Sequence, residues 1–302
     1  MAFTQYTNLD FEEIKVSLRE YLRANSNFTD FDFEGSNLSV LIDTLAYNTY
    51  VTAYNTNMVA NEAFIDSATL RENVVALARN VGYVPSSRRA STANVSFTVD
   101  LGSGTTKSSV TLKAGLVALG DFANTNYTFC TPEDITSPVS DGFAEFTIDI
   151  KQGTFVTNEF VVDTSQPNQK FIIPNPYVDT STLKVQVRDT LTSSSRKTYS
   201  QIDNIVGIST HSETFLIQEV QDEKYELLFG DGVLGKRLSN GNVINSTYIV
   251  TDGVNGNGVA NFSFSGKLVD NDGGLITSGI SDVITNQRSS NGAEVESIDT
   301  IR

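Results

Sequence analysis

The sequence predicts an α+β protein: an N-terminal α-helical region is followed by a mainly antiparallel β domain, and a further helix starts at the C-terminus. Apolar residues recur at helical spacing over residues 8–83. Over residues 94–265, Gly, Pro, Asn and Asp separate short strand-like runs, which favours a sandwich or barrel-like β domain. We therefore divide the chain into a helical assembly region (1–85), a β domain (90–268), and a linker with the start of a further helical region (269–302).

The first predicted helix is amphipathic and ordinary. Asp10 and Glu13 resemble a capping pair at its start. Charged residues occupy its other face, so we expect this helix to be half-exposed. Its apolar stripe consists of Phe11, Ile14, Leu18, Tyr21 and Leu22.

The second predicted helix is unusual because Asp43 is the only charged residue from Asn37 to Asn61. A long helix with so little charge is usually covered on several sides. One hypothesis is a helical bundle shared with other subunits, and the alternative is burial within this chain, under the β domain. The predicted partner interface consists of Leu38, Leu41, Leu45, Tyr47, Tyr50, Tyr54 and Met58.

A third helix is predicted to start near Ser67 and to end at Gly82, since Pro85 prevents its continuation. The following stretch, SSRRASTA, reads as a polar linker. Its two arginines, Arg88 and Arg89, are expected to be solvated, the alternative being contact with an acidic partner.

The glycine-rich stretch 229–258 predicts shaped turns within a β-hairpin. Asn240-Gly241 is a strong turn signal between the strand-like runs 225–229 and 243–250. A phosphate-binding loop would need its glycines between a strand and a helix N-terminus. Here a turn and another strand follow instead, so the stretch predicts no nucleotide site and no bound cofactor.

This stretch resembles the signature of the baseplate J-like family, whose members build the baseplates of contractile phage tails. A second resemblance lies in GAEVESIDTIR at residues 292–302, which in the family opens a helix leading into further domains. The chain therefore looks like the N-terminal portion of a longer protein. The motif residues of the first stretch include Phe229, Gly230, Asp231, Gly232, Gly235, Asn240 and Gly241.

The helical region resembles the N-terminal region of baseplate wedge proteins of T-even-like phages. The matching stretches are FDFEGS at 31–36, LIDTLAYN at 41–48 and NMVANEAF at 57–64, with Asp66-Ser67-Ala68 after them. The resemblance implies a structural protein of the virion, assembled in the host cytoplasm, that links wedges into an inner ring and relays conformational change to the sheath. Implied partners are a second copy of the chain and other wedge subunits, and indirectly the hub and sheath.

Composition excludes several other classes. The net charge of −15 disfavours a nucleic-acid partner or an anionic membrane, since either would need a basic face. No run of residues reaches the length of a membrane span, and the N-terminus lacks the pattern of a secretory signal. The single cysteine, Cys130, cannot form an internal disulfide or a cysteine-based zinc site, and we expect a small buried side chain.

The chain offers little catalytic chemistry, and we predict no catalytic or metal-binding residues. The only histidine, His211, lies in a predicted turn, and Asp270-Asn271-Asp272-Gly273-Gly274 lacks the spacing of a calcium loop. A cell-wall glycosidase would need paired carboxylates, for which Glu226 and Asp231 are the candidates. A glycan- or receptor-binding tail protein is the other alternative, although the charge-poor helix favours a scaffold.

Overall fold

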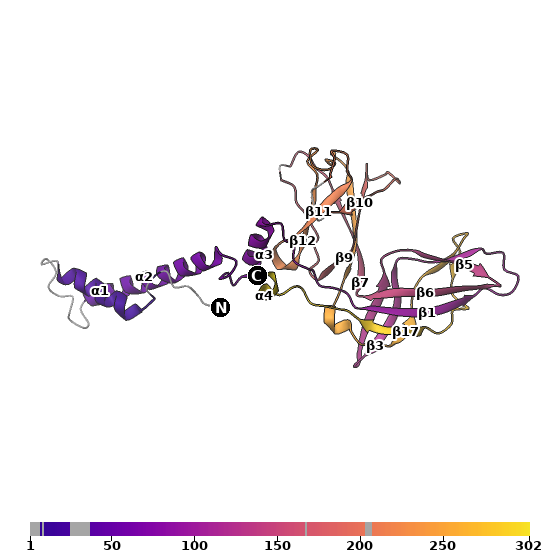
Figure 1. The fold of residues 1–302 in the computed structure, drawn as a ribbon, viewed down its shortest axis with the longest axis horizontal. Coiled ribbons are helices and arrows are strands. Elements are labelled where there is room, and N and C mark those ends of the chain that lie inside the picture. The colour runs from indigo at the N-terminus through magenta and orange to yellow at the C-terminus, as the bar shows by residue number, and fades with distance from the viewer. Residues whose placement is uncertain (1–6, 8, 25–36, 167, 203–206) are drawn as a thin grey trace. The chain divides into compact units, whose positions relative to one another are not determined.

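The computed structural model describes residues 7, 9–24, 37–166, 168–202 and 207–302. They form two compact units (Figure 1). The helical unit extends to Tyr83 and also includes Ile298–Arg302, whereas the β unit spans Val84–Ser297. The β unit is therefore an insertion between two helices of the helical unit. The predicted α+β fold class, with mostly antiparallel sheets and a short C-terminal helix, is confirmed.

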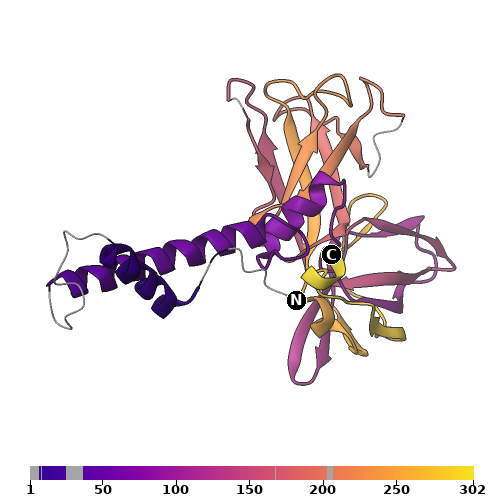
Figure 2. The same cartoon turned by 60° about the vertical axis from the view of Figure 1, so that its left-hand side comes forward.

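The helical unit contains α1 (Phe11–Arg23), α2 (Asn37–Glu62), α3 (Arg71–Asn80) and α4 (Ile298–Ile301). Asp10 caps α1 as predicted, because its carboxylate accepts the backbone N–H groups of Glu12 and Glu13. Helix α1 packs along α2 (Figure 2), where Lys15 and Asp43 form an ion pair of 2.5 Å.

The corner between α2 and α3 is held by Glu62. Its carboxylate accepts hydrogen bonds from the Thr69 N–H and hydroxyl, the Leu70 N–H and the Asn73 amide. Partial burial raises the pKa of Glu62, but these hydrogen bonds outweigh it and lower the pKa to about 2. Because the first amides of the turn bind this carboxylate, α3 starts at Arg71 and not near Ser67, where the sequence predicts it.

Helix α3 ends as predicted at Gly82, which has a φ of +82°. The Gly82 N–H donates to the Arg79 carbonyl and the Tyr83 N–H to the Ala78 carbonyl, the pattern of a Schellman motif. Helix α4 returns to this unit from the far end of the sequence. Its Ile301 is buried with α3 in a small core whose other members are Ala68, Val74, Val75 and Ala78.

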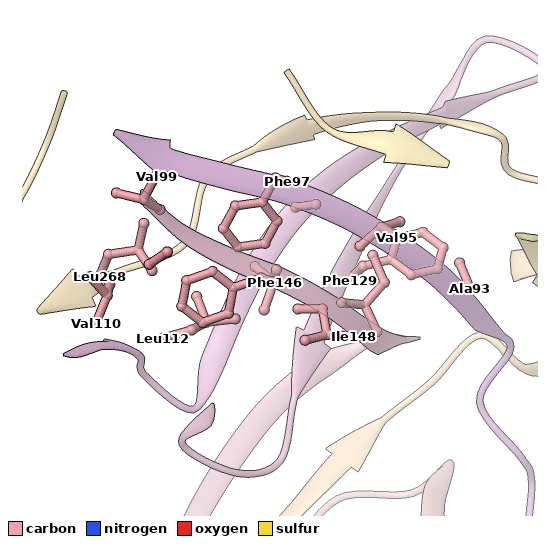
Figure 3. Close-up of a cluster of buried hydrophobic side chains, with 14 of the residues drawn as sticks. Ala93, Val95, Phe97, Val99, Val110, Leu112, Phe129, Phe146, Ile148 and Leu268 are labelled. Carbon is pink, nitrogen blue, oxygen red and sulfur yellow. The ribbon is translucent and has the colours of Figure 1, made fainter. Parts of the chain in front are cut away.

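The first sheet of the β unit is ten-stranded and antiparallel, and its core is dense in phenylalanine (Figure 3). Phe97 of β1 stacks on Phe146 of β6 with ring centroids 4.9 Å apart. The strands are β1 (Thr92–Asp100), β2 (Ser109–Leu112), β3 (Gly115–Phe122), β4 (Thr125–Thr131), β5 (Ile135–Ser140), β6 (Phe143–Gln152), β14 (Asn261–Phe264), β15 (Leu268–Asp270), β16 (Leu275–Ile276) and β17 (Ile284–Ser290).

The second sheet is seven-stranded, with the order β7-β13-β9-β10-β11-β12-β8. All its pairs are antiparallel except β10 with β11. Its strands are β7 (Thr154–Val161), β8 (Phe171–Ile172), β9 (Val178–Arg188), β10 (Lys197–Gln201), β11 (Thr214–Glu219), β12 (Tyr225–Phe229) and β13 (Val243–Val250).

The chain crosses between the sheets twice, and Gln152 joins both crossings. At the first, Gly153 separates β6 from β7 with a φ of +135°. At the second, β13 leads through the short 3-10 helix η2 (Gly253–Gly256) toward β14. The Gln152 side chain, only 1% exposed, accepts from the Thr251 hydroxyl and the Asp252 N–H and donates to the Asp252 carboxylate.

Two sequence expectations about this unit are wrong. The linker predicted at the start of the segment 269–302 contains β16 and β17, because β17 is a polar strand that gains its order from pairing with β1. The hairpin predicted around Asn240-Gly241 does not form. The strand before the turn, β12, pairs with β11 and β8, and the strand after it, β13, pairs with β7 and β9.

Candidate assembly interface

Helix α2, the long helix in Figure 2, carries exposed apolar side chains over most of its length. Its buried residues, Ser39, Ile42, Ala46, Asn57 and Asn61, lie along one face only. On the rest of the surface, six large apolar side chains are at least 46% exposed: Val40, Leu41, Leu45, Tyr47, Tyr54 and Val59. An exposed apolar surface of this length, on a helix whose only charged residues are Asp43 and Glu62, is typical of a protein contact.

These exposed residues fall into two rows, one on each side of the buried face. Their members, some of them half-buried, are spaced by three, four or seven residues, the steps that keep side chains on one face for packing against another helix. Row one consists of Val40, Tyr47, Val51, Tyr54 and Met58, and row two of Leu38, Leu41, Leu45, Thr52 and Val59.

Threonines make the α2 surface easier to dehydrate. The hydroxyls of Thr44, Thr49, Thr52 and Thr56 each donate to the backbone carbonyl four residues earlier, at 2.8–2.9 Å. Each hydroxyl therefore keeps its hydrogen bond if a neighbour covers it. Burying the surface then leaves few unsatisfied polar groups, which would otherwise oppose association.

The structure divides the predicted interface residues. Leu41, Leu45, Tyr47 and Tyr54 are exposed, and Leu38 and Met58 are half-buried within the two rows. Tyr50 is half-buried as well, but helical spacing places it beside Ala46 and Asn57 on the buried face. Sequence reasoning missed Val40 and Val59, although both keep the seven-residue spacing of their rows, Val40 seven residues before Tyr47 and Val59 fourteen after Leu45.

The glycine motif builds a compact turn after β12. Gly230 and Gly235 lie backbone to backbone, and a Cβ on Gly230 would meet the Gly235 carbonyl carbon at 2.3 Å. Gly232 and Gly235 have φ values of +92° and +83°, and the Gly232 N–H donates to the Gly235 carbonyl. Only glycine fits these conformations at little cost, so the motif is explained by backbone geometry.

Asp231 completes this turn. Its carboxylate accepts the N–H groups of Val233 and Leu234 at 2.8 and 2.9 Å, and these hydrogen bonds lower the pKa of Asp231. The second turn of the motif also forms, but only Gly241 of its two central residues has a positive φ. The Asn242 N–H donates to the Ser239 carbonyl, so this is a type II-like turn.

Arg88 is not solvated, contrary to expectation. Its guanidinium lies 2.9 Å from the Glu294 carboxylate and 4.3 Å from the centre of the Tyr177 ring. The neighbouring Arg89 has an exposed side chain, and its backbone pairs with Ala293. These contacts join the two segments that connect the β unit to the helical unit.

The candidate catalytic groups each have a structural explanation. The buried Glu226 accepts a hydrogen bond of 2.7 Å from the Gln218 amide, whereas the Asp231 carboxylate holds its own turn. His211 is exposed, with its Nδ1 2.9 Å from the Thr210 hydroxyl. Cys130 is buried as predicted, and desolvation raises the pKa of its thiol to about 12.

The turn at residues 270–274 is held by a lysine. The Lys107 ammonium lies 2.8 Å from Asp270 and 2.6 Å from Asp272. The two carboxylates that a bound cation would need are therefore already paired with Lys107. Within the described part of the chain, no three His, Cys, Asp or Glu side chains gather as a metal site. No helix in that part combines the length and apolar character of a membrane span.

Comparison with known proteins agrees with this description. Residues 10–83 match the family model of the baseplate wedge protein gp6-like helical domain. The resemblance to baseplate wedge proteins is confirmed. Most of the chain is also similar to baseplate wedge protein gp6 of Enterobacteria phage T4, with 30% identity over 278 residues.

The similarity to gp6 covers 85% of this chain but 40% of the relative. It therefore includes the β unit as well as the helical unit. The family model spans α1, α2 and α3, the elements that carry the uncharged surface. The quoted stretch at residues 31–36 falls within the matched range but lies outside the described residues.

Proposed function

We propose that this chain is a structural component of a contractile-tail baseplate and that α2 packs into a helical bundle with other wedge subunits. The observation that carries the proposal is the 26-residue helix with apolar rows on both sides of its buried face. The large apolar side chains on both sides of that face remain exposed within the described residues, so each row offers a packing surface to a further helix. The similarity to gp6, a baseplate wedge protein, supports the same role.

The wider role in this proposal follows the resemblance. The chain resides in the virion tail baseplate after assembly in the host cytoplasm, binds a second copy and other wedge subunits, and links wedges into an inner ring. It passes conformational change toward the sheath and carries out no catalysis. The structural explanations found for Glu226, Asp231 and His211 support a non-catalytic protein.

The test is light scattering on a sizing column, with the full chain alone and co-expressed with wedge subunits of the same tail. Tyr47→Asp with Tyr54→Asp places charge in row one, and Leu41→Asp with Leu45→Asp places charge in row two. We expect each pair to abolish the complex that uses its row, because a carboxylate would be desolvated there. Circular dichroism and melting of the isolated chain should stay unchanged, since these side chains are exposed.

The matched control is Tyr21→Asp, which charges an equally exposed tyrosine on α1. This control should retain every complex. If both double variants also bind the wedge subunits normally, the bundle proposal is wrong. If they unfold the isolated chain, α2 is buried within the monomer, and the bundle proposal is wrong for that reason.

A further inference from the structure

Strand β7 forms a long, regular edge of the seven-stranded sheet (Figure 1). All eight of its residues pair with β13 in an unbroken register. On its other side, β7 pairs with no strand among the described residues. The Val161 carbonyl at one end accepts from the Gln169 side-chain amide, and Phe155 near the other end approaches β3. The open backbone groups therefore lie in the middle of β7, where another strand can complete them.

The direction of these groups follows from the ladder with β13. The Val162 N–H donates to the Asn242 carbonyl, and the Asn158 carbonyl accepts from the Ser246 hydroxyl of β13, so even-numbered residues face β13. Because backbone groups alternate along a strand, Thr157 and Glu159 direct theirs outward. Their N–H and carbonyl groups have no hydrogen-bond partner within the described part of the chain.

Other strands at the margins of the two sheets are short or irregular, as protected edges usually are. Strands β8 and β16 have two residues each, and β14 has four. Strand β17 is longer, but its register with β1 shifts twice. By contrast, β7 has no proline, no bulge and a single charge, and that charge, Glu159, pairs with Arg188 at 2.6 Å. A regular edge with open backbone groups at its centre is either an aggregation hazard or a binding site.

The sequence of β7 is complementary to itself. We propose that β7 pairs antiparallel with β7 of a second copy about a two-fold axis at Asn158. In this register Val156 of one copy lies opposite Phe160 of the other, and Thr157 lies opposite Glu159. No like charges meet, and β-branched and aromatic residues pair, which favours antiparallel strands. A two-fold contact of this kind closes on itself and forms a dimer.

Asn158 gives independent support for the position of the axis. Its amide nitrogen is buried and has no hydrogen-bond partner in the monomer. An unsatisfied buried donor is costly and calls for an explanation. On the axis, each Asn158 lies directly opposite its copy, so once the side chain turns outward the amide of one can donate to the side-chain carbonyl of the other. This contact is separate from the α2 surface and does not depend on the bundle proposed above.

Single-cysteine cross-linking of the full chain tests the register. Outward-facing pairs make the new hydrogen bonds, so Asn158 and its copy form a non-hydrogen-bonded pair with Cα atoms about 4.5 Å apart, within the range of a disulfide. Asn158→Cys should therefore form a covalent homodimer under mild oxidation. The native Cys130 is buried and contributes the same low background in every variant.

Neighbouring positions serve as matched controls. Thr157→Cys and Glu159→Cys should each form little homodimer, whereas an equimolar mixture of the two should form the mixed disulfide. If Asn158→Cys cross-links no better than these single controls, and the mixture forms no mixed disulfide, the proposal is wrong. The α2 double variants should leave the cross-link intact, and its loss in them would also contradict an independent β7 contact.

Discussion

The backbone of Gly230 passes so close to that of Gly235 that a methyl group on Gly230 would lie 2.3 Å from the Gly235 carbonyl carbon. Neither backbone can move away easily. The Gly235 N–H is bound to the Ser209 carbonyl, and Gly230 forms a bridge with Arg237. The contact explains why a glycine occupies position 230 even though its φ is not positive.

We therefore predict that Gly230→Ala destabilises the β unit by about 3 kcal/mol, the upper part of the range for overpacking. The matched control is Gly241→Ala, where the added methyl meets open space but φ is +81°. That strain should cost about 1–2 kcal/mol. Denaturant unfolding, monitored by tyrosine fluorescence, gives both values. Equal stability of the two variants would show that the close backbone contact at Gly230 does not add to the cost of the substitution.

The Glu62 carboxylate should make the stability of the helical unit depend on pH. Its hydrogen bonds cap the start of α3, so Glu62→Gln should cost about 1 kcal/mol at neutral pH, as loss of a cap does. The folded pKa of about 2 lies below the ordinary value of 4.5. The stabilisation is therefore present above about pH 4.5 and is lost as the pH falls toward 2.

The measurement is thermal unfolding followed by far-ultraviolet circular dichroism over this pH range. The difference between the native protein and Glu62→Gln should narrow steadily on acidification. Glu72→Gln, which removes an exposed carboxylate from the first turn of α3, is the control. A difference that stays constant down to pH 2 would mean that the negative charge of Glu62 does not carry the effect.

Local signals in the sequence were sufficient for the start of α1 and the end of α3 but not for the pairing of strands. The Asp10 cap and the Gly82 end of α3 depend on a few neighbouring residues, so they could be predicted. The turn at Gly241 is equally local. The strands that flank β13 cannot be predicted from neighbouring residues. One of them, β7, is positioned by the crossing at Gly153, some ninety residues earlier in the chain.

The same limit applies to the candidate interfaces. The apolar surface of α2 could be predicted from spacing, but which face of the helix is buried, and with it the position of Tyr50, required the structure. The free edge of β7 could not be predicted, since a strand is an edge only once every other pairing is known. The stretch around Arg88 is polar in sequence, which predicts a solvated side chain. The carboxylate that pairs with Arg88, Glu294, lies about two hundred residues away, so the ion pair could not be predicted.

The hydrogen bonds of Gln152 should stabilise the two crossings between the sheets. Replacing it with leucine leaves the buried Thr251 hydroxyl and the Asp252 N–H without their acceptor. Each unsatisfied buried group costs about 1–3 kcal/mol, so Gln152→Leu should rank among the most destabilising changes in the β unit. Thr251→Val, which removes one of the donors, should cost less.

The double variant Gln152→Leu with Thr251→Val tests whether the two side chains belong to one hydrogen-bond network or stabilise the protein separately. With both partners apolar, the hydroxyl no longer needs an acceptor, so the combined loss should be smaller than the sum by about 1 kcal/mol. Denaturant unfolding of the four proteins gives this coupling. Additive losses would show that the two side chains stabilise the crossings independently.

Cys130 should report on opening of the first sheet. Its thiol is buried in β4, and desolvation raises its pKa to about 12. At pH 8 almost none of it is the reactive thiolate, so a disulfide reagent should modify it at least about a thousandfold more slowly than an ordinary cysteine of pKa near 8.5. Urea below the unfolding transition should raise the rate only as far as it populates open forms. Rapid modification in native buffer would mean that β4 opens locally, and the buried position described for this residue would then be wrong in solution.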